Sequence, residues 1–180
     1  MPNISKVEKA LEAVNANPEA KELVLTFGDK QVKRGEYIGR AGAQKTPSFA
    51  WSQAAPGTTY IMLALDLDAP FPSLPVLGPI LHGIQPGLTV SAAAGVGGGL
   101  TTSTPPVAGY IGPAPPPLSG PHRYVFLLYE QPSGFDAKKF MPQAEGQEFP
   151  MMQRIRFDPD KFAKEAGLGE VLAGGWFESN

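Results

Sequence analysis

Apolar and polar positions follow a helical period at the start of the chain. The apolar positions on one helical face are Ile4, Val7, Leu11 and Val14. Ser5 and Glu8 have the spacing of a capping box, in which each side chain binds a free backbone N–H of the first turn. The pattern predicts an N-terminal helix within residues 1–18, which the dipeptide Asn17-Pro18 ends.

Shorter apolar runs further along the chain predict extended segments. They are residues 21–27, 45–51, 59–68, 122–132, 153–157 and 170–177. The run at 59–68 is apolar on both faces, so we expect it in the centre of a sheet, and 122–132 has the clearest strand pattern. Residues 133–140 predict a short helix, and another begins after the N-cap residue Asp158 and ends at Gly167.

Proline and glycine are abundant, with 20 and 21 residues, and they lie among apolar segments. Their concentration predicts a long Pro/Gly-rich loop region at 86–120, and loops of this length inside a domain are often functional. Many turns between short strands indicate a mostly β, α+β protein with peripheral helices near the two ends. At 180 residues, the chain fits a single domain, 1–180.

Charge and composition restrict the classes of function. A formal net charge of −2 gives no attraction to nucleic acid or to an anionic membrane surface. No apolar run approaches the roughly 20 residues of a transmembrane helix, and the first 20 residues lack the apolar core of a secretory signal, so we expect a cytoplasmic protein. Without cysteine, the chain cannot form disulfides or use a thiolate for catalysis or zinc binding.

Two carboxylates and two imidazoles are the candidate chemical groups. Asp66 and Asp68 stand at the end of the run 59–68, where residues i and i+2 of a strand point to one face. The structural alternative is a turn, in which an aspartate before proline binds its own backbone. His82 follows the next loop, and His122 opens the clearest strand. Each histidine alone is more typical of a satisfied core or loop residue.

If these strand ends adjoin, the four side chains form a metal site, an acid–base site or an anion site. No local ligand spacing such as His-x-x-x-His supports a metal, so we expect neither metal nor cofactor. Ser119, three residues before His122, is a weak candidate nucleophile because no Gly-x-Ser-x-Gly motif surrounds it. The spacing of the two aspartates and two histidines does not distinguish an acid–base site from an anion site.

The segments LDLDAP (65–70) and GPHRYVFLLYEQP (120–132) resemble the two signature stretches of the phosphatidylethanolamine-binding protein family. That family includes inhibitors of kinases and proteases, and the Pro-rich segment after the aspartates resembles its fungal branch. The resemblance implies a large antiparallel sheet packed on a smaller sheet. It also implies a small surface pocket that takes phosphate-like or carboxylate anions.

The resemblance also assigns pocket residues. They are Asp66, Asp68, His82, His122 and Tyr124, with backbone from Ala114 and Pro115 on the anion-facing loop. It implies that the carboxylates orient the imidazoles and hold water or ligand protons at the pocket floor. As catalytic residues we therefore name His122, His82, Asp66 and Asp68, with His122 preferred as the base because the start of a strand is rigid.

Other pocket positions depart from the family pattern. Gly83 stands where many relatives carry an aromatic residue after the histidine, and Leu77 and Phe177 replace tyrosines. Ala114 replaces a glycine. Loss of an aromatic ring removes a wall of about 150–250 Å², so these changes predict a wider and more apolar pocket that is less suited to phosphate.

Two classes of function follow. One is a pocket for a small organic anion, of carboxylate or anhydride type, that catalyses or assists a carbon–carbon bond-forming or cyclisation step in fungal secondary metabolism with a pathway protein as partner. The alternative is a non-catalytic module that binds an anion or phospholipid headgroup or regulates a kinase or protease. Neither class determines the oligomeric state.

Overall fold

A computed structural model describes residues 2–91, 98–142 and 148–180. Its strands are β1 (Val24–Phe27), β2 (Lys30–Val32), β3 (Ser48–Ala50), β4 (Tyr60–Asp66), β5 (Ile80–Val90), β6 (Gly99–Thr101), β7 (His122–Glu130) and β8 (Ala173–Ser179). Its α-helices are α1 (Ser5–Ala16), α2 (Pro18–Lys21), α3 (Met151–Arg154) and α4 (Pro159–Glu165), with 3₁₀ turns η1 (Arg40–Ala43) and η2 (Ala137–Lys139).

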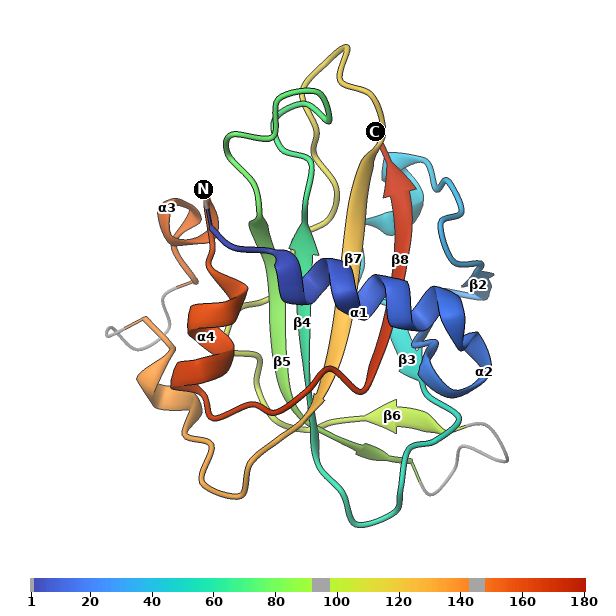
Figure 1. Cartoon of the computed structure of the whole chain (residues 1–180), viewed down its shortest axis with the longest axis vertical. Helices are drawn as coiled ribbons and strands as arrows, with labels where there is room; N and C mark the ends of the chain where they lie inside the picture. Colours follow the sequence, from blue (N-terminus) through green and yellow to red (C-terminus); the bar gives the residue numbers. More distant parts are fainter. Residues whose placement is uncertain (1, 92–97, 143–147) are drawn as a thin grey trace.

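The strands are hydrogen-bonded in the order β2-β1-β3-β6-β5-β4-β7-β8, and all neighbours are antiparallel. The long strand β5 belongs to two sheets, because its first part pairs with β4 and its last residues pair with β6. A larger sheet, β5-β4-β7-β8, therefore shares β5 with a smaller sheet of short strands. Figure 1 shows the larger sheet upright in the centre, with α1 across its front and α4 at the left, beside β5.

Alternation along β4 creates two cores. Tyr60, Met62 and Ala64 face the smaller sheet, whereas Ile61 and Leu63 face the helices. The core on the side of the smaller sheet also contains the rings of Tyr124, Phe126 and Phe177. The larger sheet is thus the middle layer of three. This arrangement confirms the predicted fold: a large antiparallel sheet packed on a smaller one, with helices outside.

Most predicted elements are confirmed. β4 is buried along its whole length between β5 and β7, and β7 begins at His122. Asp158 accepts a hydrogen bond from the backbone N–H of Lys161 (2.9 Å) and begins α4, while Gly167 ends it with a φ of 69°.

The capping box at α1 is wrong. Ser5 is the first helical residue, and its backbone N–H donates to the side-chain oxygen of Asn3 (2.9 Å); the N-cap position, Ile4, makes no side-chain hydrogen bond. The helix is held instead by its buried face, which packs Val7 and Val14 against the sheet.

The predicted loop at 86–120 contains strand residues, because β5 continues to Val90 and β6 follows; residues 92–97 lie outside the described residues. Proline and glycine within β5 are typical of loops, so the sequence pattern does not predict this part of the strand. Pro86 and Gly87 lie where the β4–β5 pairing is irregular, and the N–H of Gly87 donates to the side-chain oxygen of Gln131 (2.8 Å). A bulge tolerates both residues where a regular ladder would not.

The predicted strand at 153–157 is also wrong. α3 occupies its beginning, and a turn with Arg156 at a φ of 55° follows. Arg154, in the middle of this segment, is 4 % exposed, and its guanidinium binds backbone carbonyls. The alternation of apolar and polar residues therefore does not mark a sheet face, because the buried residue of this segment is the polar Arg154.

Candidate functional site

A small cavity lies where β4 ends, β5 begins and β7 begins, at the end of the larger sheet drawn uppermost in Figure 1. We call it the histidine cavity; its volume is about 210 Å³. Its polar side chains are Asp66, His82 and His122, and its walls are formed by Ala69, Pro70, Leu77, Ile80, Ile111, Gly112, Ala114, Pro115, Pro116 and Met151. The two histidines and one of the two predicted aspartates therefore meet in one place.

Asp66 and His122 form a buried pair across neighbouring strands. The Nδ1 of His122 lies 2.8 Å from Oδ2 of Asp66, and both residues are at most 3 % exposed. The other carboxylate oxygen of Asp66 accepts the backbone N–H of Asp68 (2.8 Å), which is the aspartate turn considered above. Asp66 thus has both the structural role and the site role.

The other ring nitrogen of His122 is occupied as well. Its Nε2 lies 2.7 Å from the hydroxyl oxygen of Ser119 and 3.2 Å from the carbonyl oxygen of Pro70. Burial alone would lower the pKa of His122, but the hydrogen bond and charge of Asp66, together with the charge of Asp68, raise it above its usual value. The raised pKa favours an imidazolium that donates to Asp66 and Ser119.

This arrangement makes Ser119 a positioning group. When His122 is charged, the serine oxygen accepts the Nε2 proton, and its own hydroxyl can donate to the carbonyl of Gly120 (3.0 Å). A serine held in this way has no base to activate it. Ser119 also does not line the cavity.

His82 is the opposite case. Its Nδ1 lies 2.7 Å from the carbonyl oxygen of Ile111, so Nδ1 carries the proton and Nε2 is the basic nitrogen. Burial lowers the pKa of His82, and the positive charges of Arg154 and His122 lower it further against the opposing charge of Asp66. Among the described residues, none donates a hydrogen bond to its Nε2. His82 therefore presents an oriented imidazole with a lowered pKa to the cavity, whereas both ring nitrogens of His122 already have partners.

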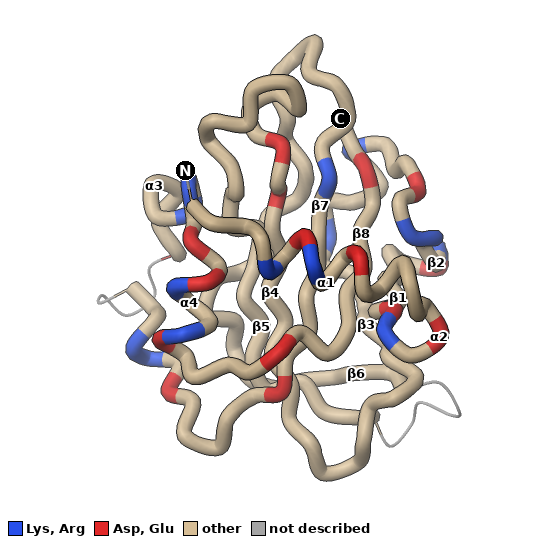
Figure 2. Tube along the Cα trace, viewed as in Figure 1, with Lys and Arg blue, Asp and Glu red and all other residues tan. Residues whose placement is uncertain are grey.

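Asp68 is not part of this cavity. Its carboxylate binds Arg123 through Nε (2.8 Å), Nη2 (2.6 Å) and the backbone N–H (2.8 Å). The expectation that both aspartates look into one place fails because β4 ends at Asp66, so the alternation of a strand no longer applies two residues later. Each carboxylate instead pairs with one of two neighbours on β7, His122 or Arg123. Figure 2 shows the acidic positions at the end of β4 beside a basic position on β7.

Leu77, Ala114 and Pro115 lie in the cavity wall as predicted. Tyr124 and Phe177 do not. They are buried in the core beneath it, with their rings stacked at a centroid distance of 5.3 Å, and the Tyr124 ring lies edge-on beneath His82 at 5.0 Å. Burial also raises the pKa of Tyr124, so its hydroxyl stays neutral.

Gly83 is not an open wall. A Cβ atom at this position would lie 3.4 Å from the Cα of Tyr110 and 3.6 Å from the carbonyl oxygen of Ala108. These are ordinary van der Waals distances, and Gly83 is not among the residues that line the histidine cavity. The widening at Gly83 stays a prediction, whereas Leu77 contributes an apolar wall residue.

Sequence analysis missed Arg154. Its guanidinium donates to the carbonyls of Gly109 (3.0 Å), Leu81 (3.2 Å) and Phe149 (3.3 Å). Leu81 immediately precedes His82, and Gly109 precedes the segment whose Ile111 carbonyl holds the His82 ring. No described carboxylate forms an ion pair with Arg154, so it places a buried positive charge behind the cavity. A buried arginine of this kind is recognised by its burial in the structure, and a single sequence does not show which arginines are buried.

The described residues contain no group of three or more His, Cys, Asp or Glu side chains arranged to hold a metal ion. In the same part of the chain, no helix is long and apolar enough to cross a membrane.

Residues 26–177 match the family described as phosphatidylethanolamine-binding protein. The chain is 42 % identical over 104 residues to phomoidride biosynthesis cluster protein N of Talaromyces stipitatus, covering 55 % of this chain and 48 % of that protein. It is 74 % identical over 31 residues to the carboxypeptidase Y inhibitor of Saccharomyces cerevisiae, covering 17 % and 14 %. CEN-like protein 1 of Nicotiana tabacum is 29 % identical over 163 residues, covering 91 % and 82 %. The match thus spans about half the length of the first of these relatives and a small part of the second.

Solved structures show the same fold. The carboxypeptidase Y inhibitor, in the complex with its cognate proteinase, superimposes with a TM-score of 0.72 at 23 % identity over 96 % of this chain and 93 % of that one. A phosphatidylethanolamine-binding protein from Plasmodium vivax superimposes with a TM-score of 0.63 at 17 % identity, over 99 % and 97 %.

Proposed function

Because this chain belongs to the phosphatidylethanolamine-binding protein family, we propose that its histidine cavity binds a small organic anion of the carboxylate or anhydride type. We further propose that His82 serves there as a general base for a carbon–carbon bond-forming or cyclisation step in fungal biosynthesis. The observation that carries this proposal is the neutral His82 imidazole, oriented by the Ile111 carbonyl and open at Nε2 in an apolar-walled cavity.

The charges around the cavity favour an anion. Asp66 is compensated by His122 and Asp68 by Arg123, so neither carboxylate repels a ligand at full strength. Arg154 then remains as a buried cation that forms no ion pair among the described residues, with the charge of Glu148 acting on it from a greater distance. A carboxylate in the cavity would compensate that charge in a region of low dielectric constant.

Size and wall chemistry favour an alkyl-bearing acid over a phosphate headgroup. The cavity, at about 210 Å³, is smaller than the roughly 300–1,000 Å³ of pockets for drug-sized ligands. Leu77, Ile80 and Met151 supply wall surface without hydrogen-bond donors. A phosphate buried against such walls would leave oxygens unpaired, which costs binding free energy.

The proposed step uses the proton acceptor that the cavity provides. His82 Nε2 removes a proton from the carbon next to the conjugated system of an unsaturated anhydride. The electron pair of the broken C–H bond moves into the enolate, and the enolate attacks an electrophilic alkene carbon of a second molecule. The imidazolium then returns the proton to the adduct, so His82 ends neutral.

The similarity to a phomoidride biosynthesis cluster protein supports the biosynthetic setting, and the fold alone would not. A cytoplasmic location and a pathway enzyme as partner belong to the same proposal.

Binding is tested by titration calorimetry of the full chain with methylmaleate and, separately, with phosphorylethanolamine. We expect methylmaleate to bind more tightly. Tighter binding of phosphorylethanolamine would contradict the organic-acid proposal and favour a headgroup-binding role.

Base catalysis is tested by deuterium exchange. In deuterated buffer, the methyl protons of dimethylmaleic anhydride are followed by NMR with the parent protein and with His82→Ala. We expect the parent to accelerate exchange and the variant to lose about 10²–10⁴-fold of that rate. Equal exchange rates with both proteins would show that His82 is not the base. If the parent protein does not accelerate exchange, the catalytic part of the proposal fails and only the binding role stands.

A second candidate function is regulation of a serine carboxypeptidase. It is favoured by the 74 % identity over 31 residues to a carboxypeptidase Y inhibitor. The short extent of that match makes it the weaker candidate. An inhibition assay with carboxypeptidase Y separates the two: inhibition that survives His82→Ala would indicate a protein-binding surface independent of the histidine cavity.

A further inference from the structure

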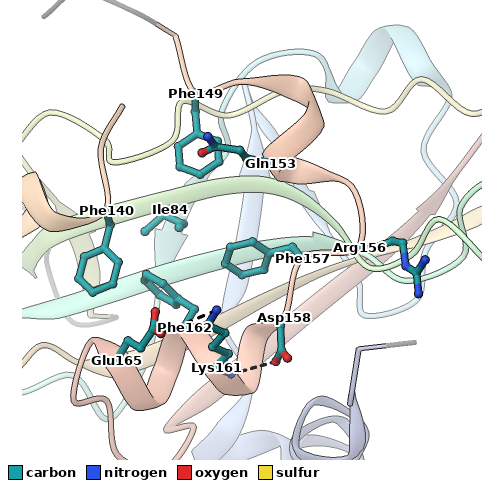
Figure 3. Close-up of a pocket in the computed structure, with 10 residues that line it drawn as sticks. All are labelled: Ile84, Phe140, Phe149, Gln153, Arg156, Phe157, Asp158, Lys161, Phe162 and Glu165. Carbon is teal, nitrogen blue, oxygen red and sulfur yellow. Dashed lines mark hydrogen bonds and ion pairs between the residues drawn. The ribbon is translucent and has the colours of Figure 1, made fainter. Parts of the chain in front are cut away.

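A second cavity, of about 330 Å³, lies between α3 and α4 on the outer face of β5. Ile84 of β5 lies at its base, and the phenylalanine rings of residues 140, 149, 157 and 162 surround it (Figure 3). We call it the phenylalanine cavity. Its volume is larger than that of the histidine cavity and lies within the range of small-molecule pockets.

The rings brace one another around this hollow. Phe162 meets Phe140 edge-on at a centroid distance of 5.2 Å and Phe157 at 5.8 Å. Phe162 is buried, but Phe140, Phe149 and Phe157 are only half-buried. Their faces therefore leave aromatic surface open, and burying such surface against an apolar ligand is favourable.

Half of the residues that line this hollow are polar or charged, and they differ in availability: Gln153, Arg156, Asp158, Lys161 and Glu165. Asp158 is already used, because it caps α4 through the Lys161 N–H. The Lys161 side chain extends toward Phe162, and its only close carboxylate, Glu165, lies at 3.9 Å in an exposed and therefore weak pair. The Gln153 amide lies over Phe149 at the opposite side, whereas the Arg156 guanidinium points away (Figure 3).

From this geometry we propose that the phenylalanine cavity is a second ligand site, for a small aromatic monocarboxylate. The ring of the ligand lies among the phenylalanine side chains over Ile84. Its carboxylate pairs with the Lys161 ammonium, in place of Glu165, and accepts a hydrogen bond from the Gln153 amide. The single available cation on one side of an aromatic bowl matches one carboxylate on one ring.

This site is separate from the histidine cavity. The backbone N–H groups of Arg156 and Phe157 donate to the carbonyls of Leu77 (3.0 Å) and Pro79 (2.9 Å), and Arg154 is fixed to Leu81 beside them. The segment that carries these bonds fills the space between the two cavities. The proposal therefore does not depend on the function proposed for His82.

The test is a titration of the full chain with 4-phenylbutyrate, followed by isoleucine-methyl NMR. Ile84 lines the phenylalanine cavity, whereas Ile80 and Ile111 line the histidine cavity, so the methyl that shifts identifies the site. We expect the Ile84 signal to shift with a Kd of about 0.1–1 mM, typical for a ligand of this size. The neutral analogue 4-phenylbutyramide should bind several-fold more weakly.

Variants make the test specific. Gln153→Trp fills the hollow from the solvent side and should weaken 4-phenylbutyrate binding at least tenfold. Met152→Trp is the matched control, because Met152 is 80 % exposed on the same helix and lines neither cavity. Lys161→Met should abolish the preference for the carboxylate over the amide, and Lys161→Arg should retain it.

Three results would overturn the proposal: no Ile84 shift up to 10 mM 4-phenylbutyrate, shifts confined to Ile80 and Ile111, or equal weakening by the two tryptophan variants. Equal binding of the acid and the amide by the parent protein would contradict the assignment of a carboxylate ligand.

Discussion

The histidine cavity and the phenylalanine cavity share the segment Met151–Phe157 but have opposite construction. In the first, the polar groups are buried and already paired: Asp66 with His122, and Nδ1 of His82 with a backbone carbonyl. In the second, the surface is aromatic, and its cation, Lys161, is 69 % exposed. Burial makes each charge in the first cavity costly to move, whereas exposure makes the charges of the second adaptable.

This difference has consequences for the two kinds of site. A buried, paired network that leaves Nε2 of His82 open holds one geometry and one tautomer, which general-base chemistry needs. An aromatic bowl accepts several ring systems, because stacking and area burial are less directional than hydrogen bonds. We therefore expect the histidine cavity to be selective and chemically active, and the phenylalanine cavity to bind related molecules with similar affinity.

The largest expected effect comes from breaking the buried pair. Asp66→Asn leaves His122 without its carboxylate at 1 % exposure, and removal of one partner from a buried pair costs about 3–5 kcal/mol of unfolding free energy. Asp68→Asn is the matched control, because its partner Arg123 has a side chain that is 43 % exposed; we expect a loss of about 1 kcal/mol. Urea unfolding measures both. Equal losses would mean that the burial of the partner residue, His122 or Arg123, does not determine how much unfolding free energy is lost.

The next effect is on the pH dependence of stability, where the two histidines have opposite signs. The pKa of His82 is lowered, chiefly by burial, so its contribution is present above its ordinary value of 6.5 and is lost as the pH falls toward the folded pKa. The pKa of His122 is raised, so its contribution is present below 6.5 and is lost as the pH rises through the folded pKa.

Each slope is at most one proton, or about 1.4 kcal/mol per pH unit. His82→Gln should remove the loss of stability on the acid side, and His122→Gln should remove the loss on the alkaline side. The measurement is the urea-derived unfolding free energy between pH 5 and 9. Removal of the same limb by both substitutions would contradict the assignment of opposite shifts.

A smaller effect should connect Arg154 to His82. Arg154→Met removes a positive charge that lowers the pKa of His82, so the variant should raise that pKa, measured from the imidazole carbon-bound protons by NMR. Arg154→Lys keeps the charge and should leave that pKa near the parent value, although both variants lose hydrogen bonds to carbonyls and melt earlier. Equal pKa values of His82 in the two variants would show that the charge of Arg154 does not act on His82 and that Arg154 has only a structural role.

The sequence predicts the histidine cavity better than the phenylalanine cavity, for a physical reason. Asp66 and His122 stand at the ends of strands with strong apolar patterns, so the pairing of β4 with β7 places them side by side. The aspartate turn was also among the alternatives. What the pattern could not show is where β4 ends, and the end of the strand decides that Asp68 turns away to Arg123.

Errors elsewhere follow from residues whose role depends on tertiary contacts. Pro86 and Gly87 indicate a loop unless a bulge accommodates them, so β5 was missed. Arg154 looks like a surface residue of a strand unless its carbonyl partners are known. The phenylalanine cavity gathers Phe162 of α4 and three rings from the segments that flank η2 and α3, whose packing no local pattern specifies.

The smallest predicted effect is a change in ligand affinity caused by a substitution at the rim of the histidine cavity. Leu77, 39 % exposed, lines this cavity at a position where the family resemblance implies a tyrosine. Leu77→Tyr adds one hydroxyl where the leucine side chain supplies no donor, and one hydrogen bond is worth about 0.5–1.5 kcal/mol. We expect the affinity for phosphorylethanolamine to rise about three- to tenfold in calorimetry, with unfolding free energy unchanged within about 0.5 kcal/mol. Val76→Tyr is the control, since Val76 is 42 % exposed and does not line the cavity. If both substitutions change the affinity equally, the apolar rim does not set the ligand preference; if only Leu77→Tyr does, the loss of that hydroxyl explains a cavity suited to organic acids.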